Sequence, residues 1–256
     1  MVPIRRVTLG NTGIETSYLG FGTGTSGYAG RSEQSKLGVE GLARLLLYAK
    51  DLGITFWDAA EDYGTHPHLA RALSQVKRDE VVVATKTFAR KSEELQNVVP
   101  RFLAELGTEY IDILLLHCIT DAKRSDQLES ALDTLIDCKK RGMVRAVGVS
   151  CHNLGALQAA TGHPKIDVVL ARINYDGVHM DASPAEVEPV LAQLHAAGQG
   201  VYGMKIYGQG QLTAECRRAM RYAFELGTVD ALVLGMKNEA EIEENVALAR
   251  EVAPVS

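Results

Sequence analysis

Apolar and polar positions divide the chain into two kinds of segment that alternate from end to end. Short, nearly continuous apolar runs, such as Val81–Thr87 and Ile111–His117, are typical of parallel strands covered on both faces. Longer segments between them carry apolar residues at helical spacing. The pattern predicts eight strands, at Leu19–Thr23, Thr55–Ala60, Val81–Thr87, Ile111–His117, Val144–Ser150, Val168–Asn174, Gly200–Ile206 and Ala231–Gly235.

The ends of the helical segments carry the usual start and stop signals. Ser183–Glu186 places a capping serine, a first-turn proline and a reciprocal glutamate in the favoured order. Glycines such as Gly107 and Gly198 follow the predicted helix ends. The predicted helices include Gly41–Asp51, Glu93–Leu106, Leu128–Lys140, Ala185–Ala197 and Ala214–Leu226.

Eight strand-then-helix units in one chain predict an α/β fold, a (β/α)8 or TIM barrel, rather than an open doubly wound sheet. Upstream of the first unit, Ile4–Leu9 and Ile14–Leu19 flank the turn Gly10–Gly13 and predict a β-hairpin. No linker or change of composition divides the sequence. We therefore expect residues 1–256 to form a single barrel domain.

Composition narrows the functional classes. The 256 residues are 46% hydrophobic, which is enough for a large core and too much for a disordered chain. A net charge of −5 disfavours binding to nucleic acid or to an anionic membrane, and no run approaches the ~18–20 apolar residues of a membrane span. The amino-terminal residues lack the apolar stretch of a secretory signal, and the four cysteines are scattered. We expect a cytoplasmic protein with reduced thiols.

The barrel topology selects the residues that could perform chemistry. In such barrels the reactive side chains lie at the carboxyl ends of the strands and in the loops that follow. Asp58 and Tyr63 follow the second strand, Lys86 ends the third, His117 ends the fourth and Ser150 ends the fifth. Lys86 and His117 each close an almost wholly apolar run, where a buried polar group requires a partner.

Four of these residues together suit the delivery of a proton. A neighbouring ammonium, Lys86, favours the phenolate of Tyr63 and should lower its pKa, and Asp58 would keep the lysine charged. His117 could orient a carbonyl group by hydrogen bonding while Tyr63 protonates the developing alkoxide. Spacing alone leaves a second interpretation open, in which Lys86 and Asp58 form a structural ion pair beside a core histidine.

Several motifs resemble those of the aldo-keto reductase family, in the family's order and along essentially the whole chain. The resemblance implies NAD(P)(H)-dependent interconversion of an aldehyde or ketone and its alcohol. It makes Tyr63 the general acid, with Asp58 and Lys86 tuning its pKa and His117 orienting the substrate. The matching segments are Leu9–Gly13, Leu19–Thr23, Phe56–Gly64, Val83–Lys86, Tyr110–His117, Gly142–Ser150 and Glu244–Asn245.

The resemblance also implies where a nicotinamide cofactor would bind. Ser150 matches the serine that bonds the nicotinamide carboxamide, with Asn174 able to assist, and Gly208–Leu212 matches the pyrophosphate loop. NADP(H) is favoured and NAD(H) is the alternative, because Glu241 stands where the family often has arginine. The implied cofactor residues are Ser150, Asn174, Lys205, Gly208, Gly210, Leu212, Lys237, Glu241, Glu244 and Asn245.

The sequence departs from the family at the nicotinamide end. Cys151 replaces an asparagine, Leu170 a glutamine and Met204 a stacking aromatic residue. The Met204-Lys205 pair resembles a bacterial branch, some members of which carry a cysteine-rich tail for an iron–sulfur cluster. No such tail follows here, so we expect neither a cluster nor a metal. The pair His66 and His68 is interpreted as part of a loop and helix start.

Three functions remain in competition. The first is an oxidoreductase acting on a small carbonyl or alcohol substrate. The second is a cofactor-binding sensor or partner-binding protein with negligible turnover, suggested by the altered carboxamide residues. The third is a lyase or isomerase that uses Lys86 as a Schiff-base amine. Specificity is assigned to the loops 24–36, 119–125 and 175–182, and the short chain predicts a shallow, open active site.

Overall fold

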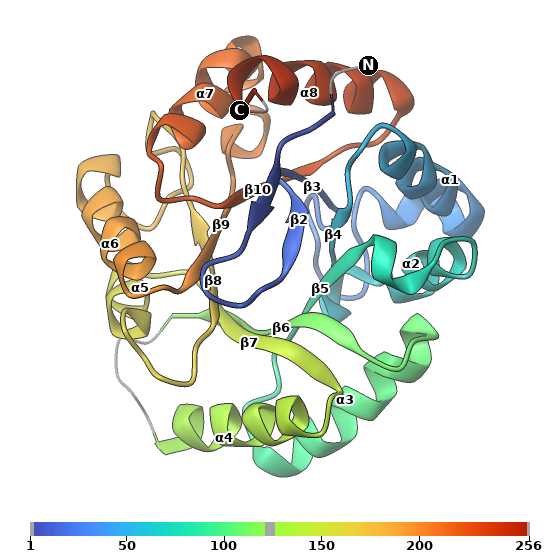
Figure 1. Cartoon of the computed structure of the whole chain (residues 1–256), viewed down its shortest axis with the longest axis vertical. Helices are drawn as coiled ribbons and strands as arrows, with labels where there is room; N and C mark the ends of the chain where they lie inside the picture. Colours follow the sequence, from blue (N-terminus) through green and yellow to red (C-terminus); the bar gives the residue numbers. More distant parts are fainter. Residues whose placement is uncertain (1–2, 121–125, 255–256) are drawn as a thin grey trace.

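The computed structural model describes residues 3–120 and 126–254, and it forms a closed barrel of parallel strands (Figure 1). The strand order around the barrel is β10-β3-β4-β5-β6-β7-β8-β9, and β9 pairs with β10 to close it. The strands are β3 (Leu19–Gly22), β4 (Phe56–Asp58), β5 (Val82–Thr87), β6 (Ile111–Ile119), β7 (Val144–Cys151), β8 (Val168–Arg172), β9 (Gly200–Met204) and β10 (Ala231–Gly235).

Helices surround the barrel on the outside, as Figure 1 shows. Each follows a strand, as a right-handed parallel crossover requires. The helices are α1 (Gly38–Asp51), α2 (His66–Leu73), α3 (Ser92–Leu106), α4 (Asp126–Lys140), α5 (Leu154–Ala160), α6 (Pro184–Ala196), α7 (Cys216–Glu225) and α8 (Glu239–Val252). This arrangement confirms the predicted (β/α)8 fold.

Strand residues alternate between two hydrophobic clusters. Leu114 and Leu116 on β6 belong to the large cluster between barrel and helices, whereas Ile113 and Leu115 belong to a smaller cluster that fills the barrel interior. Tyr202 on β9 also belongs to the interior cluster. Because side chains alternate along a strand, the next inward position on β6 is His117. The register of each strand therefore decides which polar side chains reach the inside of the barrel rim.

The predicted hairpin closes the amino-terminal end of the barrel. Its strands are β1 (Arg6–Thr8) and β2 (Glu15–Ser17), and Leu9 and Ile14 beside them are buried in the interior cluster. At the turn, Gly10 has a φ of +48°, and a Cβ there would lie 2.3 Å from the backbone nitrogen of Gly200. Only glycine fits this contact, because any side chain would clash with the start of β9. A reaction site is therefore expected at the opposite, carboxyl-terminal end of the barrel.

Element boundaries differ from the predictions by a few residues. Strand β6 continues two residues past His117, to Ile119, and β8 ends at Arg172 rather than Asn174. The predicted capping box of α6 is present, since the Ser183 amide donates to the Glu186 carboxylate over 3.1 Å. Within the described residues, every helix is too short or too polar to cross a bilayer.

Candidate active site

Four predicted residues meet at the carboxyl-terminal rim of the barrel. Asp58 ends β4, and Lys86 and His117 lie near the ends of β5 and β6. Each follows an interior-facing residue by two positions, so the period of the strand turns all three inward. Tyr63 lies just beyond β4, in the short 3-10 helix η2 (Glu61–Tyr63).

The ammonium group of Lys86 is fully buried and has two hydrogen-bond partners in the described chain. It donates to Asp58 Oδ2 over 2.7 Å and to the Ala59 carbonyl over 2.7 Å. The centre of the Tyr63 ring lies 5.0 Å from Nζ, so the phenol is the third neighbour of the ammonium group. A lysine has three donors, and two of them are satisfied by Asp58 and Ala59.

This arrangement shifts the pKa values of both groups. Burial alone would lower the pKa of Lys86, but Asp58 and Tyr63 outweigh burial and raise it, so the amine stays protonated. Burial raises the pKa of Tyr63, and the positive charge of Lys86 opposes that rise. The sequence-based expectation of a lowered phenol pKa is therefore wrong for the free protein, because desolvation outweighs the ammonium.

Tyr202 is a member of this cluster that sequence reasoning missed. It is fully buried on β9, and its hydroxyl donates to Asp58 Oδ1 over 3.0 Å. Asp58 thus receives one donor on each carboxylate oxygen, from Tyr202 and from Lys86. Burial raises the pKa of Asp58, and these two donors oppose the rise. Tyr202 lies two residues before Met204, at an inward position that the strand period could have revealed.

The loop after β3 packs directly on the ring of Tyr63. A Cβ on Gly24 would lie 2.2 Å from a carbon of that ring, and one on Gly27 would lie 2.4 Å from it. Neither distance is tolerated by real side chains, so both positions require glycine for close packing. The loop thus fixes the position of the Tyr63 ring.

A β-bulge carries His117 and Cys118. Leu116 pairs with Val149, and Ile119 pairs with Cys151. Between these two pairs β6 is therefore one residue longer than β7. Cys118 takes the left-handed conformation, with φ +59°, at this extra residue. Bulges redirect side chains and are frequent beside active sites.

His117 is a neutral imidazole in this environment. Burial, with the nearby charge of Lys86, lowers its pKa to about 2. Its Nδ1 is buried and has no hydrogen-bond partner among the described residues. The ring lies edge-on to Tyr63, with centroids 5.7 Å apart, and 4.6 Å from the ring of Phe88. A neutral histidine beside the phenol can donate one hydrogen bond to a carbonyl oxygen.

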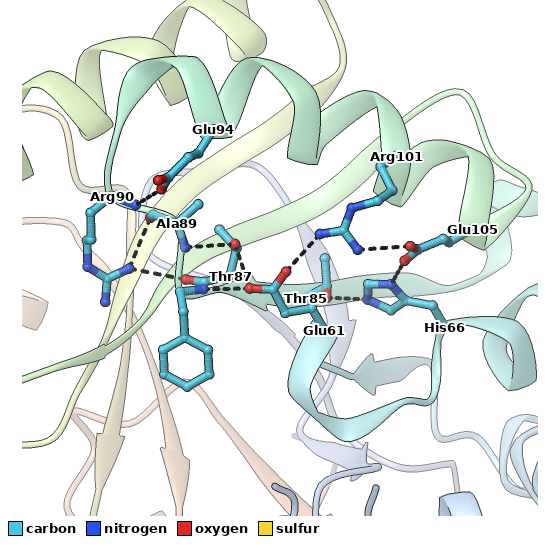
Figure 2. A network of polar contacts seen from close by, with 10 residues as sticks. Glu61, His66, Thr85, Thr87, Ala89, Arg90, Glu94, Arg101 and Glu105 are labelled. Atoms are coloured by element: carbon cyan, nitrogen blue, oxygen red, sulfur yellow. Dashed lines mark hydrogen bonds and ion pairs between the residues drawn. The ribbon is translucent and has the colours of Figure 1, made fainter. Parts of the chain in front are cut away.

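Glu61, in the turn that carries Tyr63, bonds the end of β5 and the Phe88 amide that follows it. Figure 2 shows Glu61 with its partners Thr87 and Arg101. One oxygen of Glu61 accepts from the Phe88 amide over 2.7 Å and from the Thr87 hydroxyl over 2.8 Å. Its other oxygen accepts from Arg101 on α3 over 2.9 Å. Glu61 therefore has a structural role. Phe88 itself is 46% exposed, which leaves an apolar ring open to a ligand beside His117.

The network in Figure 2 continues from Arg101 to His66. Arg101 donates to Glu105, which bonds Nδ1 of His66 over 2.6 Å, and Nε2 of His66 contacts Thr85 over 2.7 Å. Both ring nitrogens are thus engaged with protein groups. Among the residues that the structure describes, no three histidine, cysteine or acidic side chains are grouped to hold a metal ion.

A cavity of about 530 Å³ opens beside Tyr63 and Asp58, within the range of small-molecule and cofactor sites. It extends along Leu170 and Met204 toward α8. Six of the ten predicted cofactor residues line it, namely Lys205, Gly210, Lys237, Glu241, Glu244 and Asn245. A second cavity, of about 660 Å³, lies at the amino-terminal end beside Gly13 and Glu15, away from the predicted residues.

The other four predicted cofactor residues, Ser150, Asn174, Gly208 and Leu212, are buried. The hydroxyl of Ser150 has no hydrogen-bond partner within the described chain, so it is free to bond a carboxamide. Asn174 differs from expectation, because its amide holds the following loop. Its Nδ2 donates to the carbonyls of Val178 and Lys205, and its Oδ1 accepts from the Val178 amide over 3.1 Å.

The predicted pyrophosphate loop forms the 3-10 turn η4 (Gly208–Gly210). Its residues have φ values of 53°, 56° and 100°, but the amides of Gly208, Gly210 and Leu212 donate to carbonyls of the chain itself. Backbone amides are therefore less available than expected. The ammonium groups of Lys205 and Lys237 along the cavity supply the positive charge that a phosphate-bearing cofactor needs, so the site fits one.

At the far end of the cavity, Glu241 has a structural partner. Its carboxylate accepts from the Lys237 amide over 2.8 Å and from Asn238, whose side chain caps α8 in return. Asn245 is similarly engaged, donating to the Glu241 carbonyl and accepting from the Tyr207 hydroxyl. Both still border the cavity.

His152 and Arg172 are further residues at the rim that sequence reasoning left without a role. His152 lies just past β7, with its ring 6.1 Å from that of His117, and Arg172 ends β8. Their Nδ1 and Nη2 atoms are 2.6 Å apart. Both residues could have been found from the strand period, because His152 follows Ser150 by two positions and Arg172 follows Leu170 by two positions.

Comparison with known proteins agrees with this geometry. The family model for the aldo/keto reductase family matches residues 18–219. L-galactose dehydrogenase from Arabidopsis thaliana is 25% identical over 98% of this chain and 90% of its own. An aldo-keto reductase from Mycobacterium avium is 29% identical over 86% of this chain and 74% of its own.

A solved Pseudomonas aeruginosa protein assigned to the same family superposes with a TM-score of 0.80 at 26% identity, covering 98% of both chains. The family match spans most of the barrel, from β3 into α7. It therefore includes every strand end that contributes Asp58, Lys86 and His117. On this evidence the chain is a member of the aldo/keto reductase family.

Proposed function

We propose that the protein is an NAD(P)(H)-dependent oxidoreductase that interconverts an aldehyde or ketone and the corresponding alcohol. One observation carries the proposal: the buried ammonium of Lys86 bonds Asp58 and Ala59 and lies 5.0 Å from the centre of the Tyr63 ring. A structural ion pair would not need a tyrosine as its third neighbour at the mouth of a cavity. The arrangement supports Tyr63 as a proton donor whose protonation is influenced by the charges of Lys86 and Asp58.

In this mechanism His117, Tyr63 and Lys86 have different roles. His117, neutral and with an aromatic wall at Phe88, would donate a hydrogen bond to the carbonyl oxygen and orient it. Tyr63 would give its proton to that oxygen, and Lys86 would stabilise the phenolate that remains. A bound nicotinamide supplies the hydride to the carbonyl carbon. Oxidation of the alcohol reverses these roles, with Tyr63 as the base.

For the cofactor we propose NADP(H) first and NAD(H) as the alternative. Lys237 is half-exposed at the far end of the cavity, with Nζ 4.0 Å from Glu241. Because Glu241 already accepts two hydrogen bonds within the chain, it repels a ribose phosphate less than a free carboxylate would. Separate fluorescence titrations with NADPH and NADH decide between the two.

The test of the function is the substitution Tyr63→Phe. We expect it to lower kcat for carbonyl reduction by roughly 10²- to 10⁴-fold, while NADPH still binds, because only the transferable proton is lost. Tyr110→Phe, beside the second cavity at the amino-terminal end of the barrel, is the matched control and should retain full activity. If Tyr63→Phe reduces carbonyls as fast as the unaltered protein, the proton donor is another group.

A cofactor-binding sensor is the second candidate. It is favoured by the apolar residues Leu170 and Met204 beside Tyr63 in the cavity, and by the engagement of Asn174 in its own loop. Tight NADPH binding without turnover across a carbonyl panel would support it. A Schiff-base function is disfavoured, because a nucleophilic lysine must be neutral and the pKa of Lys86 is raised.

A further inference from the structure

Arg172 is held at the rim of the barrel by two partners. Its Nη1 donates to Asp181 Oδ1 over 3.0 Å, and its Nη2 donates to His152 Nδ1 over 2.6 Å. It follows the inward-facing Leu170 by two positions on β8, so the strand period also turns it inward. About a fifth of its side chain remains exposed. The guanidinium is therefore fixed in position and still reachable.

The contact with Arg172 determines the tautomer of His152. A guanidinium can only donate, so Nδ1 of His152 accepts and Nε2 carries the ring hydrogen. Burial lowers the pKa of His152 to about 4, with Arg172 and Lys205 adding to the effect, so the ring is neutral. Within the described chain, the buried Nε2 of His152 and Nε of Arg172 have no hydrogen-bond partner. Two donors of this bonded pair of residues therefore have no acceptor within the described chain.

These donors lie close to His117. The ring of His117 lies 4.6 Å from that of Phe88 and 6.1 Å from that of His152. Phe88 is apolar, whereas His152 is bonded to Arg172. A substrate whose carbonyl meets His117 and Tyr63 would therefore have Phe88 and the His152–Arg172 pair close to its remaining atoms.

The charges around this part of the rim favour an anion. Four cations act on His117 and His152, and three carboxylates oppose them. Asp58 pairs with Lys86 and Asp181 with Arg172, and Glu61 acts on Arg90. Burial and the charge of Arg172 both lower the pKa of Lys205, which reflects positive charge without enough compensation. The four cations are Lys86, Arg90, Arg172 and Lys205.

We propose that Arg172, positioned by His152 and Asp181, binds the carboxylate of an oxo-acid substrate, so that the enzyme reduces carbonyl compounds that carry a carboxylate. Guanidinium and carboxylate match in shape and charge, and their hydrogen bonds are stronger than neutral ones. In the reduction the carbonyl carbon would gain the hydride and its oxygen the proton of Tyr63, while the carboxylate stays unchanged. This inference rests on the proposed function.

The test compares 4-oxobutanoate with butanal, two four-carbon aldehydes that differ in the carboxylate. We expect kcat/KM to favour 4-oxobutanoate, and Arg172→Met to reduce that preference by roughly 10- to 100-fold. His152→Phe keeps the ring volume and removes both nitrogens, and should reduce the preference less. Arg221→Met, at an exposed arginine of α7 that contacts Glu251, is the control and should leave both substrates unaffected.

Three results would overturn the inference. One is equal kcat/KM for the two aldehydes in the unaltered protein. Another is a parallel loss of both activities in Arg172→Met together with weaker NADPH binding, which would assign the guanidinium to the cofactor. The third is an unchanged preference in both variants.

A protein that reduces neither aldehyde refutes the proposed function by itself. The carboxylate site is then decided by NMR on the cofactor-free protein. The ring signals of His152 should shift with 4-oxobutanoate and stay in place with butanal. Identical responses to the two compounds would reject the site.

Discussion

Tyr202→Phe tests how far a residue outside the cavity controls the proton donor. The substitution removes one hydroxyl, which donates to Asp58 Oδ1 over 3.0 Å, and leaves the ring packed 5.1 Å from that of Phe56. A hydrogen bond to a charged group contributes about 1.5–3 kcal/mol. We therefore expect the free energy of unfolding to fall by that amount, and Tm by roughly 3 to 12 °C.

The same substitution should move the pH profile. The charge of Asp58 raises the pKa of Tyr63, and without the Tyr202 hydroxyl that charge is less dispersed. The pKa of Tyr63 should therefore rise. Reduction needs the protonated phenol, so activity is lost as pH rises through this pKa, and the loss should move to higher pH. Oxidation needs the phenolate, so it should be slower near neutral pH.

The assay is the pH dependence of kcat/KM in both directions, with urea unfolding measured alongside. Tyr18→Phe is the matched control, because the Tyr18 hydroxyl is also buried but has no hydrogen-bond partner within the described residues. It should leave stability and the pH profile nearly unchanged. If Tyr202→Phe unfolds like this control and its profile does not move, Tyr202 does not influence Asp58 and our reasoning is wrong.

Three other predictions follow from packing and charge. Gly24→Ala places a methyl group 2.2 Å from the Tyr63 ring, so kcat/KM should fall by roughly tenfold or more, whereas Gly41→Ala in α1 should have no such effect. Glu61→Gln loses the charge facing Arg101 and should lower the free energy of unfolding by about 1 kcal/mol in urea titrations. His117→Asn should reduce the loss of folding stability between pH 7 and pH 5 by up to about 2 kcal/mol. Over this pH range the histidine takes up a proton in the unfolded protein but stays neutral in the folded protein. Equal pH slopes for His117→Asn and the unaltered protein would contradict the last prediction.

The barrel could be predicted from the sequence because its signals are local and repeated. Apolar runs such as Ile113–Leu116, capped helix starts such as Ser183 and glycines after helices recur along the chain, so small boundary errors do not change the topology. The order of strands then places Asp58, Lys86 and His117 at one rim without any knowledge of contacts. The fold and the catalytic cluster share this origin.

The residues and contacts that surround the catalytic cluster were harder to predict from the sequence. The β-bulge at Cys118 cannot be read from Leu116–Ile119, because the letters fit a regular strand equally well. Yet this extra residue lets the Cys118 thiol lie 3.2 Å from Nδ1 of His152, beside His117. The hydrogen bonds that occupy Asn174 and Glu241 also depend on loop conformation, so their apparent freedom in the sequence was misleading.

The pKa of Tyr63 depends on a line of contacts that begins with a glycine. A Cβ on Gly20 would lie 2.9 Å from the ring of Phe56, so only glycine on β3 lets that ring occupy the interior. Phe56 meets Tyr202 edge-on, and the Tyr202 hydroxyl holds one oxygen of Asp58 while Lys86 holds the other. Packing in the barrel interior thus orients the Tyr202 hydroxyl, and its hydrogen bond to Asp58 affects the negative charge that faces Lys86. We conclude that the core of this barrel and its chemistry cannot vary independently, because an enlarged residue on β3 would reach the proton donor through four side chains, those of Phe56, Tyr202, Asp58 and Lys86.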